Sequence, residues 1–285
     1  MRMKKLIKTE WLYISPALSI ILTIFFFPTI YSFVLSFLEK SSFTSEYSFV
    51  GLKNFEVIMN KPYFSISILN TIIYGFGAVT IKALLGLSVA LLLNRKFPGR
   101  GILRAICILP WALPTFAVCV IFWFIYDYRG LANIFLRQLG FPSIGWLNTD
   151  NAMFSVILVN VWKGWPFFFL GFLTGLQAIP KELYEAGEID GASSFQKLKY
   201  ITLPLLIPVI LTVVLLSLVW TMADFTTIYM MTGGGPLYAT LTAPMASYKI
   251  AFLLERSLSM ASAYNLTILP IYLIIMYLLL KRLGI

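Results

Sequence analysis

The chain has 285 residues, of which 59% are hydrophobic and only 12% charged, and its mean hydropathy is +0.86. This composition excludes an ordinary soluble domain and predicts a protein that lives in a lipid bilayer. The formal net charge of +10 requires no nucleic-acid partner, because an excess of Lys and Arg facing anionic lipid gives the same sum.

Six stretches are apolar and long enough to cross a hydrocarbon core about 30 Å thick, which takes about 20 residues of helix. They are continuous rather than alternating, and so they favour a helical bundle over a β-barrel. The first stretch is too long for a signal peptide and lacks a small-residue cleavage site, so we expect it to be retained. The sequence predicts an all-α membrane protein, a single domain over 1–285, with spans at 11–37, 64–93, 102–126, 152–176, 205–231 and 263–280.

Basic residues indicate the orientation, because Lys and Arg near the ends of the spans are retained on the cytoplasmic side. With the N-terminus inside, thirteen basic residues fall on the cytoplasmic side and seven in the outer loops. We therefore expect a multi-pass protein of the cell membrane with both termini in the cytoplasm. The polar segment 181–204, between the fourth and fifth stretches, is expected on the same side.

Several kinds of chemistry are not expected of this chain. It contains no histidine, and its cysteines, Cys107 and Cys119, both lie inside the third stretch, where they are expected to be packing residues. No carboxylate or cysteine cluster has metal-ligand spacing, so no bound metal is expected. The pattern GxxxxGK[ST] is also absent, so the chain is not expected to be an enzyme that hydrolyses ATP.

The segment 181–204 reads KELYEAGEIDGASSFQKLKYITLP. Pro180 is suited to begin a helix, early acidic residues suit the positive end of its dipole, and Gly191 is suited to end it. A second short helix is expected after a Ser N-cap, and the chain is expected to return to the membrane at Pro204. The result is a helix-turn-helix.

One face of the first short helix carries little bulk, since Leu183, Ala186, Gly187 and Asp190 fall at positions i, i+3, i+4 and i+7. Such a face is suited to a protein partner. The alternative on composition alone is a solvated connector whose charges keep it out of lipid.

The pattern EAGEIDGA, followed after eight residues by ITLP, resembles the EAA motif of the permease subunits of ABC importers. In that family the motif forms the loop that docks into a groove of the ATPase subunit. Position by position, Glu185 and Ala186 match the first two motif residues, Gly187 stands where the second alanine usually is, and Gly191 matches the central glycine. Leu203 and Pro204 match the closing pair. The resemblance implies that these residues, with Asp190, couple the chain to the ATPase.

Four further motifs narrow the resemblance to the maltose-type, carbohydrate branch of this family: FVGLKNFEVIM, ILPWALP, NVWKGWPFFF and TGGGP. The resemblance implies a transmembrane permease subunit of an ATP-driven importer of an oligosaccharide or disaccharide, from a bacterium or an archaeon. It further implies a heterodimer with a second permease subunit, two ATPase subunits that bind ATP and Mg, and an extracellular solute-binding protein. The chain itself is expected to bind no cofactor.

Three charged residues, Lys82, Lys163 and Asp224, fall within the apolar stretches, where a central charge costs about 2.5 to 3.5 kcal/mol on insertion scales. Lys82 has no evident partner, and the simpler interpretation is a packing or snorkelling residue. Lys163 and Asp224 could pair across the bundle, although Asp224 is close enough to TGGGP to be hydrated near the outer surface.

Asn160, Gly164 and the tryptophans beside them form a polar and aromatic group, which suits the hydroxyls and C–H faces of a sugar. Aromatic residues in membrane helices are more often packing residues or interface anchors. The resemblance adds positions at which maltose-type permeases contact their sugar. The substrate path implied consists of Trp111, Thr115, Asn160, Lys163, Gly164, Phe167, Ser217 and Thr221, to which the charge argument adds Asp224.

Other classes of protein remain open on the residues alone. An importer of the same architecture could carry glycerol phosphate or a glycerophosphodiester instead of a sugar. An ion-gradient-driven secondary transporter would also need charges in its spans, but not the EAA loop. An intramembrane enzyme is disfavoured by the lack of an evident nucleophile and base.

Overall fold

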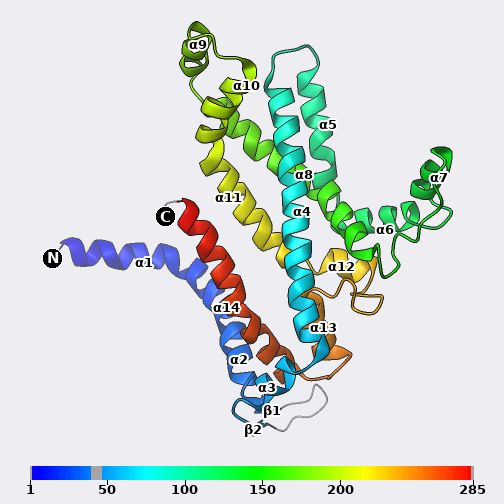
Figure 1. The fold of residues 1–285 in the computed structure, drawn as a ribbon. Helices are drawn as coiled ribbons and strands as arrows, with labels where there is room; N and C mark the ends of the chain where they lie inside the picture. Colours follow the sequence, from blue (N-terminus) through cyan, green and yellow to red (C-terminus); the bar gives the residue numbers. More distant parts are fainter. Residues whose placement is uncertain (1, 40–46, 284–285) are drawn as a thin grey trace. The chain divides into compact units, whose positions relative to one another are not determined.

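The computed structural model describes residues 2–39 and 47–283, and most of them are helical (Figure 1). Contacts divide the chain into two compact units. Unit 1 contains the residues up to Phe64 together with Ser247–Pro270, and unit 2 contains Ser65–Ala246 and the residues from Ile271 onward. Three helices contribute to both units: α4 (Pro62–Asn94), α13 (Ala243–Phe252) and α14 (Leu258–Leu283).

Unit 1 begins with α1 (Arg2–Ile21), which continues through a π-helical turn at Leu22–Phe26 into α2 (Phe27–Leu35). A two-residue antiparallel ladder joins β1 (Leu38–Glu39) to β2 (Ser48–Phe49), and α3 (Lys53–Met59) follows. The side chain of Asn54 on α3 is buried and donates hydrogen bonds to two backbone carbonyls, those of Ser36 and Leu38. This buried amide ties the end of the first span to α3 within the unit.

In unit 2, α4 is followed by α5 (Arg100–Ala112), α6 (Thr115–Ile125), α7 (Leu131–Gln138) and α8 (Ala152–Ala178). The chain continues through α9 (Lys181–Ile189), α10 (Ser194–Lys197), a π-helical turn at Leu198–Thr202, α11 (Leu203–Met222) and α12 (Thr226–Met231). Helix α8 packs against both α5 and α11, and the buried rings of Phe168, Phe169 and Phe172 fill the core between them. Gly86 lets α4 approach α8 closely, because a Cβ at that position would overlap Phe168 of α8.

Among the described residues, five helices are long and apolar enough to cross a membrane, and α5 with α6 makes a sixth if that bent pair counts as one span. The six predicted stretches therefore coincide with these helices, but two of them are not continuous. The third is bent by 93° between α5 and α6, and the fifth ends at Met222, before the separate helix α12.

The bend in the third stretch follows from the sequence WALPT. Leu113, before a proline, is extended (φ −72°, ψ 141°), and Pro114 is extended too (φ −59°, ψ 136°). The proline ring disfavours a helical conformation at the residue before it, and proline has no N–H to donate to the preceding turn. The prediction of a span at 102–126 did not include this bend, because a proline within an apolar run does not lower its hydropathy enough to reveal a break.

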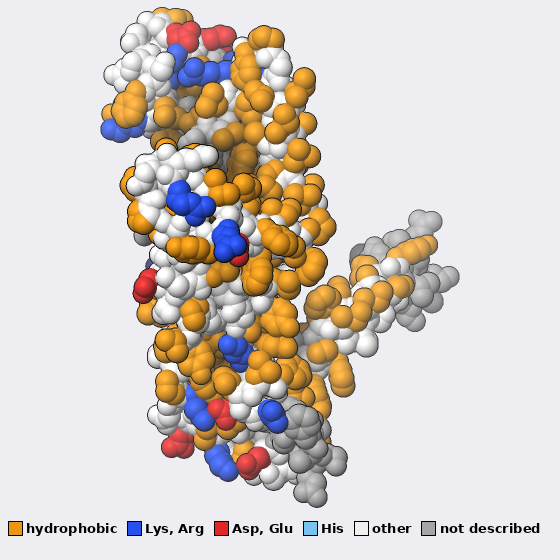
Figure 2. All heavy atoms as spheres, turned by 90° about the vertical axis from the view of Figure 1, so that its right-hand side faces the viewer, with side chains coloured by type: hydrophobic (Ala, Val, Ile, Leu, Met, Phe, Trp, Pro, Cys, Tyr) orange, Lys and Arg blue, Asp and Glu red, His pale blue; other side chains and the backbone are white. Residues whose placement is uncertain are grey.

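Apolar side chains cover much of the flank of the molecule in view (Figure 2). The first span is the extreme case, since only 6% of its apolar window is buried within the chain. In unit 2, acidic and basic side chains gather at the end formed by α9 and α10 (Figures 1 and 2). Apolar surface on long helices, with charge at the helix ends, is the distribution a bilayer requires.

Candidate functional site

A pocket of about 310 Å³ lies in unit 2, between helices that are distant in sequence. Its lining comes from α4, from the α5–α6 bend, from the middle of α8, and from the end of α11 with the segment that follows. All nine residues of the path predicted from the sequence line this pocket: Trp111, Thr115, Asn160, Lys163, Gly164, Phe167, Ser217, Thr221 and Asp224. The structure thus brings together residues that the sequence distributes over more than 110 positions.

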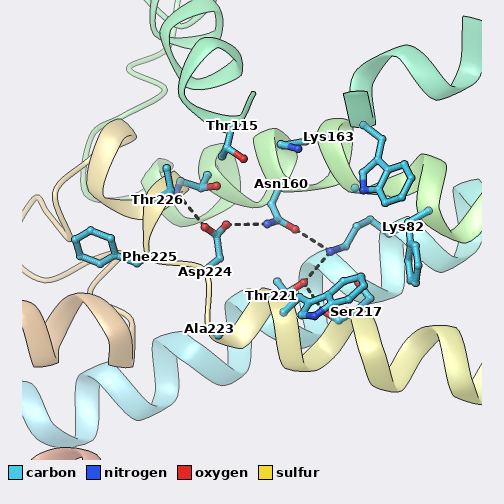
Figure 3. Close-up of a pocket in the computed structure, with 15 residues that line it drawn as sticks. Lys82, Thr115, Asn160, Lys163, Ser217, Thr221, Ala223, Asp224, Phe225 and Thr226 are labelled. Carbon is cyan, nitrogen blue, oxygen red and sulfur yellow. Dashed lines mark hydrogen bonds between the residues drawn. The ribbon is translucent and has the colours of Figure 1, made fainter. Parts of the chain in front are cut away.

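A chain of hydrogen bonds joins five side chains at one side of the pocket, and Figure 3 shows four of them, those of Lys82, Asn160, Thr221 and Asp224. Tyr74 Oη donates to Asp224 Oδ2 over 2.7 Å, and Asn160 Nδ2 donates to the same oxygen over 2.9 Å. Lys82 Nζ donates to Asn160 Oδ1 and to Thr221 Oγ1, both over 2.8 Å. The chain of bonds therefore links α4, α8, α11 and the segment between α11 and α12.

Lys82 is the residue that the sequence interpretation missed. Its side chain is 3% exposed and crosses the inside of unit 2, so it does not snorkel to the surface of the bundle. Its two hydrogen-bond partners are 78 and 139 residues away in sequence. A lone lysine in an apolar helix is a signal for a buried partner, but the sequence alone does not identify the partner.

Asp224 has different partners from those expected. The ion pairs within the described residues join Lys53 to Glu39, Lys61 to Glu255 and Lys197 to Glu188, so the proposed pair of Lys163 with Asp224 does not form there. The carboxylate of Asp224 instead accepts hydrogen bonds from Tyr74, from Asn160 and from the backbone N–H of Thr227. These three donors satisfy a partly buried carboxylate that makes no direct ion pair within the described residues.

Gly164 lies under the side chain of Lys82. A Cβ at Gly164 would be 2.8 Å from Lys82 Cδ and 3.4 Å from Nζ. In the structure that space is occupied by the lysine stem, so the glycine gives Lys82 its route to Asn160.

Three side chains of the pocket remain available for a ligand. Among the residues that the structure describes, the side chains of Thr115, Lys163 and Ser217 have no hydrogen-bond partner, although all three line the pocket. Thr221, in contrast, accepts from Lys82 and donates to the carbonyl of Ser217. The hydrogen-bonding capacity open to a ligand is therefore concentrated on the α6, α8 and α11 walls.

Aromatic rings form another wall of the pocket. The ring of Phe167 lies 6.1 Å from that of Trp111 and 5.2 Å from that of Trp220, measured between centroids. Trp220 was not predicted, nor were Ala223 and Phe225–Thr227, which continue the lining after α11 on either side of the predicted Asp224. The helix break after Met222 places this segment at the pocket, and the uninterrupted hydropathy of the fifth stretch concealed that break.

In the polar segment 181–204, α9 is a short helix and a second helix begins at Ser194. Pro180 precedes α9, and Gly191 follows it with a φ of +77°. The N–H groups of Gly191 and Ala192 bond to the carbonyls of Glu188 and Gly187, which is the Schellman arrangement at a helix end. Ser193 caps α10 through a reciprocal capping box with Gln196.

The second short helix does not end before the membrane span. Ser194–Met222 forms one helix of 29 residues, in which the π-helical turn directly precedes Leu203 and Pro204 at the start of α11. A wider turn at this point accommodates the proline, which can donate no backbone hydrogen bond. Leu203 is half-buried and Pro204 is exposed.

Gly187 lies on a buried side of α9 and not on the open face that was expected. It is buried, and a Cβ there would be 3.2 Å from Ile201 Cδ1. Nearby, Lys197 pairs with Glu188 over 2.6 Å, and Tyr184 bonds to Thr202 over 3.0 Å. This side of α9 therefore packs on the chain's own next helix, so Gly187 does not belong to an open face.

The outward side of the segment carries the other predicted residues and some unpredicted ones. Glu185, Ala186 and Asp190 are exposed. Ile189 is 87% exposed and Phe195 71% exposed, which is unusual for large apolar side chains on an otherwise polar segment. Both were missed because they do not belong to the small-residue pattern, although an isoleucine and a phenylalanine within a charged helix-turn-helix are a recognisable signal.

The fold and the pocket together define a polytopic helical membrane protein with a polar cavity among its spans, the class that contains transporters. Residues 82–283 match the family described as "Binding-protein-dependent transport system inner membrane component", and the chain belongs to this family. It is therefore a transport component of the membrane rather than a catalytic subunit. The family that the EAA pattern indicated is confirmed.

Two relatives and one solved structure illustrate the similarity. The chain is 40% identical over 243 residues to a trehalose/maltose transport system permease protein of Thermococcus litoralis, covering 85% of this chain and 82% of that one. It is 35% identical over 239 residues to a sulfoquinovosyl glycerol transport system permease protein of Agrobacterium fabrum, covering 82% and 77%. Its fold matches a chain of a bacterial ABC transporter involved in alginate import, with a TM-score of 0.81, 20% identity and coverage of 100% and 99%.

Proposed function

We propose that this chain is the permease subunit of an ATP-driven sugar importer and that the 310 Å³ pocket is part of the path of the sugar. The observation that carries the proposal is the convergence of the nine residues predicted from the sequence on one pocket. Its wall of three aromatic rings suits the C–H faces of a sugar, and the hydroxyls of Thr115 and Ser217 suit its hydroxyls. The names of the two relatives, both carbohydrate transport permeases, support the same solute class.

The proposal assigns ATP hydrolysis to partners. The segment 181–204 would face the cytoplasm and dock on an ATPase subunit, which binds ATP and Mg, and the chain itself would bind no cofactor. The exposed side chains of Ile189 and Phe195 support a protein partner at this surface, because large apolar groups are enriched where partners bind. Glu185, Ala186 and Asp190 lie on the exposed part of the same segment.

The remaining parts of the proposed assembly are a second permease subunit, a second ATPase subunit and an extracellular solute-binding protein. A heterodimer would complete a path whose other half this chain lacks. The family's dependence on a binding protein supports the last partner. Both termini would lie in the cytoplasm of a bacterium or an archaeon, as the distribution of Lys and Arg favours.

Uptake into proteoliposomes tests the solute and the pocket together. The assembled importer with its binding protein would be offered radiolabelled maltose, trehalose and glycerol 3-phosphate. Trp220→Leu, which removes an aromatic wall of the pocket, should raise the KM for the transported sugar. Trp162→Leu is the matched control, because Trp162 packs on Phe122 and does not line the pocket. Uptake of glycerol 3-phosphate alone would contradict the sugar assignment, and equal effects of the two tryptophan variants would contradict the pocket.

Co-purification tests the docking surface. Ile189→Asp should reduce recovery of the ATPase subunits with the tagged permease, because it places a charge where an apolar contact is expected. Lys181→Asp is the control, since it adds the same carboxylate to the same helix without removing an apolar side chain. Full recovery with Ile189→Asp would show that the partner binds elsewhere.

A further inference from the structure

We propose that Lys82 is a positioning residue of the pocket. It fixes the side-chain amide of Asn160 together with Asp224, and it leaves direct recognition of the solute to Thr115, Lys163 and Ser217. This inference rests on the proposed function, because it assigns roles to residues of the same path. It reverses the roles expected from the sequence, where Asn160 was a direct contact and Lys82 a packing residue.

Both ends of the Asn160 amide are already occupied. Its oxygen accepts from the ammonium group of Lys82 over 2.8 Å, and its nitrogen donates to the carboxylate of Asp224 over 2.9 Å. A flipped amide would bring its N–H groups against a cation and its oxygen against an anion. The amide therefore has one stable orientation, held by two charge-assisted bonds.

Lys82 is itself held at both its stem and its head group. Its stem crosses Gly164, where no side chain blocks it, and its ammonium group also donates to Thr221 Oγ1 over 2.8 Å. Thr221 is free to accept this bond because its own proton is donated to the carbonyl of Ser217 over 2.7 Å. Donors and acceptors are thus matched along the whole series.

The bond between Lys82 and Thr221 is shielded from water, which otherwise would compete for it. Lys82 and Thr221 are each 3% exposed. Polar groups that bond to one another in such surroundings are held more rigidly than at a hydrated surface, and removing one partner leaves the others unsatisfied. A sugar hydroxyl that took the place of Lys82 or Asp224 at Asn160 would break one of these bonds, whereas the side chains of Thr115, Lys163 and Ser217 make no hydrogen bond within the described residues.

A double-mutant cycle distinguishes positioning from direct contact. The KM for uptake of radiolabelled maltose would be measured in proteoliposomes of the complete importer carrying Lys82→Met, Asn160→Ala or both. Methionine keeps an unbranched stem across Gly164 but donates no hydrogen bond. Each single variant should raise KM on the order of tenfold. The double variant should be no worse than the poorer single variant, because Lys82 acts through Asn160.

Lys163→Met is the matched control, since Lys163 lines the same pocket without a hydrogen bond to Asn160 within the described residues. Its effect on KM should multiply with that of Asn160→Ala. A multiplicative effect of Lys82→Met with Asn160→Ala would overturn the proposal. So would a lowered Tm for Lys82→Met with unchanged KM, which would make Lys82 merely structural.

The Tm of the purified complex separates this inference from the proposed function. Failure of the wild type to take up any sugar would overturn the sugar assignment, and the cycle would then be read from Tm. Non-additive changes in Tm for Lys82→Met and Asn160→Ala would still support the positioning of Asn160 by Lys82. Additive changes would overturn it whatever the solute.

Discussion

The close approach of Lys82 to Gly164 makes one added methyl group a sensitive probe of the pocket. In Gly164→Ala the new Cβ would be 2.8 Å from Lys82 Cδ, whereas ordinary contact begins at 3.4 Å. The lysine stem must therefore move by 3.4 − 2.8 = 0.6 Å or more. Its head group is held by two bonds of 2.8 Å, so this movement lengthens or breaks at least one of them.

The magnitude follows from two opposing contributions. A hydrogen bond to a charged group contributes about 1.5 to 3 kcal/mol, whereas alanine is favoured over glycine within a helix by about 1 kcal/mol. Loss of one bond therefore destabilises the protein by about 0.5 to 2 kcal/mol, and loss of both by about 2 to 5 kcal/mol. Because the shifted Lys82 releases the amide of Asn160, the KM for sugar should rise as well.

The assay is the Tm of the purified complex together with uptake kinetics. Gly101→Ala serves as the control, since a Cβ at that helical glycine meets nothing within 4 Å. Gly164→Ala should lower Tm and raise KM, while Gly101→Ala should do neither. In a Lys82→Met background, Gly164→Ala should change Tm and KM little, because no hydrogen bonds depend on the position of the methionine side chain. The reasoning is refuted if the two glycine variants behave alike.

Three further predictions concern other parts of the chain. Gly187→Trp should prevent α9 from packing on the following helix and abolish co-purification with the ATPase, whereas Gly187→Ala, 3.2 Å from a flexible side-chain end, should be tolerated; equal recovery of both variants would contradict this. Burial raises the pKa of Glu255, but hydrogen bonds from Lys61 and Tyr63 and the charge of Lys61 outweigh it, so the pKa lies below 4.5. The resulting stabilisation is complete above the unfolded pKa and lost as pH falls through the folded pKa, so the Tm difference between wild type and Glu255→Gln should shrink in acid; a difference independent of pH would exclude this account. In a cysteine-free background, Ser194→Cys should react with an impermeant thiol reagent only from the cytoplasmic side and Thr149→Cys only from outside; reversed labelling would invert the proposed orientation.

The positions of the spans could be predicted because hydropathy is a local property of the sequence. The breaks within them could not, since Pro114 interrupts a helix without making the stretch polar, and α11 ends before Ala223–Phe225 with no proline or glycine to mark the break. The helix ends in the segment 181–204 were easier to predict, because Pro180, Gly191 and Ser193 act through their own backbone or through the nearest turn.

The pocket was predicted as a set of positions but not as a network. Motif matches identified Asn160 and Thr221, but hydrogen bonds between them and Lys82 span 78 and 139 residues, and no local pattern encodes such a separation. The burial of Gly187 could not be predicted for the same reason. Which face of α9 is buried depends on where the helix that follows Ser193 lies. A helical wheel of α9 alone gives no information on that position.

The 29-residue helix Ser194–Met222 has a mechanical consequence. At 1.5 Å per residue, the distance along it from Ser194 to Thr221 is about 40 Å. A rigid rod of that length turns a tilt of about 5° at one end into a displacement of about 3.5 Å at the other. This displacement exceeds the tolerance of any hydrogen bond made by Lys82. The π-helical turn at Leu198–Thr202 lies near the Ser194 end of this helix. A pivot at this turn would leave most of the length of the helix free to move.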